Sequence, residues 1–214
     1  MLRTSGDRPI TVEVLRFDTS EVLRGELNGD KPLELAFSFA DELEEEVAED
    51  PVEGTPEAPE ISGYVTLNDD TGVLTVDVPN EWADVNTTPL TLGDGTQVPR
   101  IEAAPSIADF ESTYNVPGLF FLSFGPQASL DETLALFAPV PGECTDNGIQ
   151  DYSDPAYTGR YQTFTDCAGT TTVYVTVAAI PADNSYTAVV GIQLVSDADL
   201  AVLDQVFATF FVTS

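Results

Sequence analysis

Two apolar stretches near the C-terminus decide the fold: TTTVYVTVAAI at residues 170–180 and YTAVVGIQLV at residues 186–195. Both are rich in valine and threonine and have the length of β-strands. The residues between them, ADNS at 182–185, favour a turn, so the two strands are expected to pair with each other. An antiparallel sheet is therefore predicted at the centre of this part of the chain.

A helix is predicted directly after these strands, over residues 197–210. Its apolar side chains recur at helical spacing, at Leu200, Leu203, Val206, Phe207 and Phe210. A stripe of this kind packs against an apolar surface, and here that surface is the sheet.

Further strands and short helices are predicted upstream. Strands are expected at 63–67, 72–79, 118–124 and 157–164, and helices at 105–111 and 129–137. Ser129 and Glu132 have the spacing of a capping box at a helix start. The pair Phe120-Phe121 places one ring on each face of its strand, so both faces are expected to be covered. Hairpin-joined strands with helices at intervals predict an α+β domain, an antiparallel sheet flanked by helices.

Composition divides the chain into three parts. Residues 1–37 contain two alternating segments that predict a β-hairpin, which alone is marginal in water and is therefore interpreted as the remnant of a domain that begins upstream. Residues 38–60 are acidic and contain three prolines, so they are predicted to be a linker or, alternatively, an arm that docks on a basic partner. Residues 61–214 are predicted to be the α+β domain.

The charge excludes several partners. The chain has 37 acidic and 7 basic residues, a net charge of −30. Binding to nucleic acid or to an anionic membrane surface requires a basic face, which this composition cannot build. The sequence also has no apolar run long enough for a transmembrane segment. The acidity is interpreted as a solubility device, with a specific role in cation binding as the alternative.

The absence of histidine excludes several chemistries. With no histidine in the sequence, neither a Ser-His-Asp nor a Cys-His nucleophile system can form, and His-based zinc or copper sites are excluded. Two cysteines alone do not make a structural zinc site, and no glycine-rich phosphate loop is present. We therefore expect no catalytic triad and no cofactor.

The pattern of residues 61–214 resembles the PsbP-like fold of small actinobacterial lipoproteins and of tail domains in secreted serine proteases. The stretches that carry the resemblance are VDVPNEW at 76–82, AAP at 103–105, VPGLF at 116–120, YTGRY at 157–161 between Cys144 and Cys167, and DADL at 197–200. The resemblance implies an extracytoplasmic, non-catalytic module without a known ligand. The runner-up is a small-molecule or lipid-binding module of the lipoprotein type.

The N-terminal part resembles the C-terminal edge of a PDZ domain in PDZ-bearing, trypsin-like secreted bacterial serine proteases. The similar segments are Leu2-Arg3-Thr4, the strand at 10–17 and DTSEVLRGEL at 18–27. The resemblance implies that protease and PDZ domains of the same polypeptide are the partners of this chain, and that it acts as an accessory to them by binding a partner or positioning the protease.

The two cysteines, Cys144 and Cys167, are predicted to form a disulfide. An even pair in an extracytoplasmic chain favours a bond, and the spacing is far from that of a Cys-x-x-Cys redox motif. Two buried thiols and a redox pair are the alternatives.

The aromatic residues Trp82, Tyr152, Tyr157 and Tyr161 are candidates for a ligand cleft. A tryptophan after a strand, and tyrosines at alternate positions, equally fit core and sheet-face packing. An apolar cleft near Trp82 would favour the small-molecule alternative.

Carboxylates near the cysteines could still perform chemistry. Asp146, Asp151 and Asp154 are candidate calcium ligands, although no EF-hand spacing is present. A glycosidase needs two carboxyls on opposite sides of a sugar, and with twenty acids in residues 61–214 such pairs arise by chance. No metal site is therefore assigned.

The charge generates a first prediction, on stability in salt. Residues 61–214 contain only two basic residues to balance twenty acids, so compact folding raises repulsion among carboxylates. Salt shortens the Debye length to about 3 Å at 1 M, so the melting temperature should rise with sodium chloride, most steeply at low concentration. A calorimetric series from millimolar to molar salt checks this, and a flat or falling melting temperature would show that repulsion does not limit stability.

Overall fold

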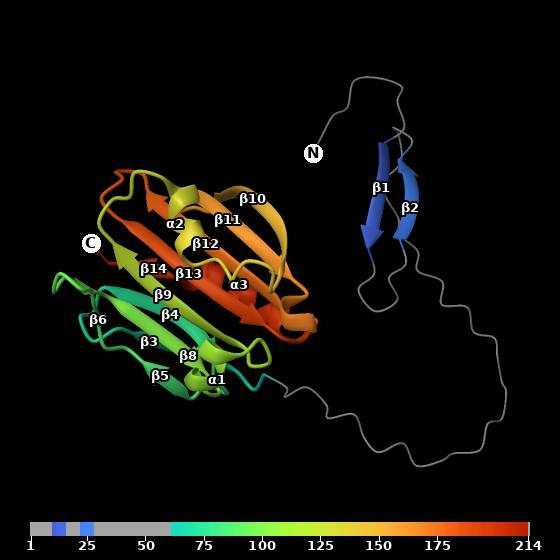
Figure 1. Ribbon diagram of the computed structural model, residues 1–214. Helices are drawn as coiled ribbons and strands as arrows, with labels where there is room; N and C mark the ends of the chain where they lie inside the picture. The colour runs from blue at the N-terminus through green and yellow to red at the C-terminus, as the bar shows by residue number, and fades with distance from the viewer. Residues whose placement is uncertain (1–9, 16–21, 28–60, 214) are drawn as a thin grey trace, which may run out of the picture. The chain divides into compact units, whose positions relative to one another are not determined.

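The computed structural model describes residues 10–15, 22–27 and 61–213 (Figure 1). The chain divides into two compact units, Met1–Glu53 and Gly54–Ser214, and each is described by itself. In the first unit, β1 (Ile10–Leu15) pairs antiparallel with β2 (Val22–Leu27), with Ile10 opposite Leu27, which agrees with the predicted hairpin. The predicted acidic linker, 38–60, and the boundaries of the 1–37 segment lie outside the described residues.

The second unit is built on a seven-stranded sheet in which every neighbouring pair is antiparallel. In spatial order the strands are β10 (Thr145–Ser153), β11 (Tyr157–Thr165), β12 (Val173–Pro181), β13 (Thr187–Leu194), β9 (Gly118–Phe124), β8 (Arg100–Ala104) and β5 (Asp84–Asn86). The two valine- and threonine-rich stretches predicted to pair, β12 and β13, lie next to each other near the centre of this sheet. A sheet-dominated α+β fold is confirmed.

Smaller elements cover the sheet (Figure 1). A three-stranded sheet has the order β14 (Phe211–Val212), β4 (Leu74–Pro79), β3 (Tyr64–Asn68), and a short hairpin joins β6 (Leu90–Thr91) to β7 (Gln97–Val98). The helices are α1 (Ile107–Ser112), α2 (Leu130–Leu136) and α3 (Asp199–Thr209), with a 3-10 turn at Cys167–Gly169. None of the helices in the described residues combines the length and apolarity that crossing a membrane requires.

The main core lies on the sheet face that α3 and β4 cover. It contains Ala188, Val190 and Ile192 of β13, which alternate along the strand and point to the same face. From α3 it takes Val202 and Val206, both fully buried. The buried face of α3 therefore differs from the predicted one. Val206 and Phe210 are buried as expected, but Leu200 is 50% exposed. Val202, which is not among the residues of the predicted stripe, lies at the centre of the contact.

The opposite face of the sheet is covered by α2. Leu134 of α2 is fully buried against Ala178 of β12 and Val189 of β13. On β9, Phe121 is fully buried in the main core and Phe120 lies on the α2 side, so the prediction of one ring on each face is confirmed.

Serine caps begin the two short helices. The side chain of Ser106 accepts a hydrogen bond from the Asp109 amide at the start of α1, and that of Ser129 accepts one from the Glu132 amide at the start of α2. Each cap satisfies an amide that the helix itself leaves without a partner, typically stabilising the helix by about 1 kcal/mol.

The predicted disulfide is present between Cys144 and Cys167, with Cα atoms 4.0 Å apart. Cys144 lies just before β10, and Cys167 is fully buried in the 3-10 turn after β11. Phe164 and Tyr174 pack around Cys167 in a separate apolar cluster on the α2 side. The bond therefore ties the sheet's β10–β11 edge to the segment that follows α2.

A second prediction concerns this disulfide. Replacing both Cys144 and Cys167 with alanine opens a loop of sequence separation 23, which should lower the free energy of unfolding by about 3 kcal/mol in the chain-entropy description. Urea denaturation of the variant and of the parent, both without reductant, measures the difference. Equal midpoints, or two freely alkylated thiols in the folded parent, would contradict it.

Candidate functional site

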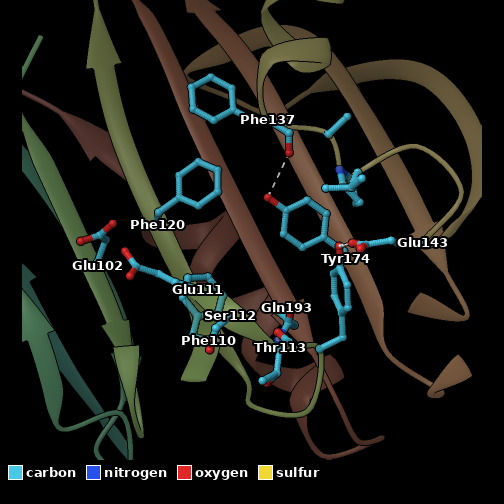
Figure 2. Close-up of a pocket in the computed structure, with 14 residues that line it drawn as sticks. Glu102, Phe110, Glu111, Ser112, Thr113, Phe120, Phe137, Glu143, Tyr174 and Gln193 are labelled. Carbon is cyan, nitrogen blue, oxygen red and sulfur yellow. Dashed lines mark hydrogen bonds between the residues drawn. The ribbon is translucent and has the colours of Figure 1, made fainter. Parts of the chain in front are cut away.

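A groove on the α2 side of the sheet is the strongest candidate site, and it is called here the α2-face groove (Figure 2). Its cavity has a volume of about 460 Å³ and lies between the segment that follows α1 and the segment that follows α2. Five of its lining residues are aromatic: Phe110, Tyr114, Phe120, Phe137 and Tyr174. Three more are acidic: Glu102, Glu111 and Glu143.

The floor of the groove is aromatic because Phe120 of β9 and Tyr174 of β12 lie on the sheet face that α2 covers, next to Phe137 at the end of α2. Phe120 projects from β9, and its ring lies over Gly191 of β13, where a Cβ would stand 2.2 Å from Phe120 Cε1. The Phe120 and Phe137 ring centroids are 5.3 Å apart. The hydroxyl of Tyr174, from β12, donates a hydrogen bond of 3.1 Å to the Phe137 carbonyl, which ties the two sides of the floor together (Figure 2).

One wall of the groove is fixed by a buried amide. Gln193 of β13 is only 2% exposed, and its Nε2 donates to the carbonyls of Thr113 and Val116, at 3.1 and 2.6 Å. The hydroxyl of Thr172 donates to the Tyr114 carbonyl in the same segment. These bonds satisfy polar groups that would otherwise be buried without partners, and they hold the segment between α1 and β9 in place.

The other wall depends on the disulfide. Glu143 precedes Cys144, and its carbonyl accepts a 2.6 Å hydrogen bond from the Ala168 amide, next to Cys167. The hydroxyl of Tyr114 donates to the Glu143 carboxylate across the groove, at 3.1 Å. The covalent link and these two bonds fix where the Glu143 carboxylate stands.

Partial burial shifts the pKa values of several carboxyl and hydroxyl groups in the groove. Burial raises the pKa of Glu102, and the nearby charge of Glu111 adds to this, while Arg100, at 3.3 Å, and Asn86, at 3.1 Å, act in the opposite direction. Burial raises the pKa of Tyr174 to about 12, and burial together with the bond to Glu143 raises the pKa of Tyr114. Both tyrosines therefore stay protonated at neutral pH.

The four aromatic residues proposed from the sequence as a cleft do not form one site. Trp82 and Tyr157 are each 3% exposed and belong to the main core, where the Tyr157 ring stacks on Phe210 at 5.1 Å between centroids. Tyr152 and Tyr161 line a second cavity, also about 460 Å³, on the α3 side of the sheet. This α3-face cavity also includes Leu200, Leu203 and Phe207, which α3 contributes.

The three candidate calcium ligands are engaged separately. Asp146 accepts from the Gly148 amide and from Gln162, at 2.8 and 2.9 Å. Asp151 pairs with Arg160. Asp154 accepts from the Ala156 and Tyr157 amides, both at 2.7 Å, and from the Tyr152 hydroxyl.

Within the described residues no three Asp, Glu or Cys side chains come together in a way that could hold a metal ion. The aspartates near the cysteines instead stabilise turns and one ion pair. A further cavity of about 390 Å³ adjoins the α2-face groove and shares with it the ridge 138–140, and Asp146 lines this cavity.

The residues of the α2-face groove were not candidates at the sequence level, except as strand and helix formers. A signal was present: if Phe121 faces the main core, Phe120 faces away from it, as do Tyr174 on β12 and Gln193 on β13. What the sequence does not show is that α1 and α2 leave a gap over these side chains. That gap depends on tertiary packing.

The contact between Gly191 and Phe120 generates a third prediction. Gly191→Ala would place a methyl group inside the Phe120 ring, so the ring must leave its position. The free energy of unfolding should fall by about 1–3 kcal/mol, as in an overpacked core. Gly125→Ala is the control, because a Cβ there meets nothing within 4 Å. Denaturation curves of the two single variants measure the difference in the free energy of unfolding. The double variant Gly191→Ala with Phe120→Ala should lose less free energy of unfolding than the two single variants lose together. Equal losses for Gly191→Ala and Gly125→Ala would contradict the contact.

No family model matches the chain, and no curated protein matches it. The function therefore has to be inferred from the geometry and the charge of the groove.

Proposed function

We propose that residues 61–214 form a non-catalytic, extracytoplasmic accessory domain of a secreted trypsin-like serine protease, which binds a partner or positions the protease. The observation that carries this proposal is the α2-face groove. Its floor is aromatic, its walls are fixed by buried hydrogen bonds, and its cavity of about 460 Å³ has the size of a ligand pocket.

Two polar side chains of the groove, Tyr174 and Gln193, are engaged in structure rather than in acid–base chemistry. General acid–base catalysis needs groups whose pKa lies near the working pH. Tyr174 is held protonated by burial, and its hydroxyl is already used in the bond to the Phe137 carbonyl. The Nε2 of Gln193 likewise donates to two carbonyls. Rigid aromatic surface with satisfied polar groups is typical of recognition sites.

The disulfide supports the proposed location. Disulfides form and persist in oxidising compartments and are rare in the cytosol. Here the bond has a clear structural task, because it holds the wall of the groove that carries Glu143. An extracytoplasmic location agrees with the resemblance to secreted proteases and lipoproteins.

The α3-face cavity favours a second candidate, a small-molecule or lipid-binding module. Tyr152, Tyr161, Leu203 and Phe207 give it a mainly apolar lining. Saturable binding of a neutral apolar fluorophore, lost in Leu203→Trp and kept in Phe137→Leu, would favour this candidate over the first.

A fourth prediction tests the accessory role. The reading frame upstream of Met1 should encode a His, Asp and Ser protease domain followed by the rest of a PDZ domain. In that full-length protein, deleting 61–214 should leave kcat on a short chromogenic peptide unchanged within about twofold, because the domain supplies no catalytic group, and should raise KM for a protein substrate.

The control is the full-length protein with its protease serine replaced, which must be inactive with or without the domain. Purified chain 1–214 should hydrolyse neither substrate. An upstream frame without a protease, turnover by the purified chain, or unchanged kinetics on both substrates after deletion would each contradict the proposed role.

A further inference from the structure

The α2-face groove carries an uncompensated negative charge. Glu102, Glu111 and Glu143 line it. The domain's two arginines are already paired: Arg100 with Glu102, and Arg160 with Asp131 and Asp151. Arg100 therefore offsets one of the three glutamates, and the other two, Glu111 and Glu143, leave a negative potential at the exposed side of the groove.

The aromatic side chains add a second attraction for cations. The face of a phenyl or phenol ring is the negative end of its quadrupole and attracts a cation placed over it. Figure 2 shows the rings of Phe120, Phe137 and Tyr174 next to one another, with Glu111 beside Phe120 and Glu143 beside Tyr174. A cation above these rings would contact aromatic faces below it and carboxylates at its sides.

The hydrogen bonds of the groove indicate which kind of cation fits. A primary ammonium has three N–H donors, and each loses a bond to water unless an acceptor replaces it. On the aromatic floor the backbone carbonyls already accept hydrogen bonds, that of Phe137 from Tyr174 and those of Thr113 and Val116 from Gln193. The acceptors left for an ammonium are the carboxylates of Glu111 and Glu143, at exposed positions. A quaternary ammonium has no N–H, so it needs no acceptor from the floor, and its methyl groups contact the ring faces directly.

We propose that the α2-face groove binds a small quaternary ammonium cation, with its methyl groups over Phe120, Phe137 and Tyr174 and its charge balanced by Glu111 and Glu143. The inference rests on the proposed function of the domain as a binding module and names the chemical class that the groove would take. A phosphate or carboxylate on the ligand would face the same glutamates, so the groove should prefer a free cation to a zwitterion or a phosphocholine headgroup.

Choline is the probe for this inference, titrated into the full chain at constant ionic strength and followed by calorimetry and by amide chemical shifts. Its neutral carbon isostere, dimethylbutanol, has the same shape without the charge. Butylammonium supplies a primary amine, glycine betaine a zwitterion and phosphocholine the headgroup. Choline should bind saturably and at least about fivefold more tightly than each of these, with shifts at Phe120, Phe137 and Tyr174.

Matched variants locate the site. Glu111→Gln removes a charge from an exposed position on the groove and should weaken choline binding about threefold. Glu132→Gln makes the same change on the exposed surface of α2, away from the groove lining, and should leave binding unchanged. Phe137→Leu should weaken binding about fivefold by removing one ring face.

The outcomes separate this inference from the accessory role. Equal binding of choline and dimethylbutanol, tighter binding of butylammonium, or no saturable binding of any cation would overturn the quaternary-ammonium site. None of these results alters the upstream reading frame or the kinetics of the domain deletion, which decide the accessory role independently. If Glu132→Gln weakens choline binding as much as Glu111→Gln does, then only the overall charge attracts the ligand. That result would also overturn the site.

Discussion

Strand β13 is the constraint on which the rest of the domain depends, because all eight of its residues are buried. A strand with apolar residues on both faces is stable only when both faces of its sheet are covered. Ala188, Val190 and Ile192 require α3 and the β14–β4–β3 sheet on one side. Val189 requires α2 on the other. The two layers around the sheet thus follow from the side chains of this one strand.

The two ends of β13 on the α2 side are covered differently, and the groove arises from that difference. Near Val189 the apolar surface is closed by Leu134 of α2. Farther along, Gly191 has no side chain and Gln193 is polar, so this end is covered by the Phe120 ring and by a hydrogen-bonded loop rather than by a helix. The buried Gln193 amide holds two carbonyls of this loop rigidly, and the loop does not close over the rings of Phe120 and Phe137, which line the cavity. Aromatic rings therefore remain open to a ligand between α1 and α2.

The sequence was informative where side-chain periodicity and burial agree. The long strands β12 and β13, the cap at Ser129 and the disulfide all have local signals, and the structure contains them. It was uninformative for β10, Thr145–Ser153, a polar edge strand that pairs on one side only and is mostly exposed. The contributions of Tyr157 to the core and of Tyr174 to the groove depend on which face each strand presents, and that is set by register. Trp82 lies in the turn between β4 and β5, and its burial depends on how that turn packs.

Glu102 is a partly buried charge at the groove, and its surroundings show how the fold accommodates it. A carboxylate that is half removed from water raises the free energy of the folded state, and its elevated pKa reflects that cost. Arg100 of β8 and Asn86 of β5 offset part of this cost through an ion pair and a hydrogen bond, and Glu102 also lines the cavity. A sequence selected for stability alone would place an uncharged side chain here. Folds that keep a locally unfavourable charge typically do so at functional sites, which agrees with the binding role proposed for the groove.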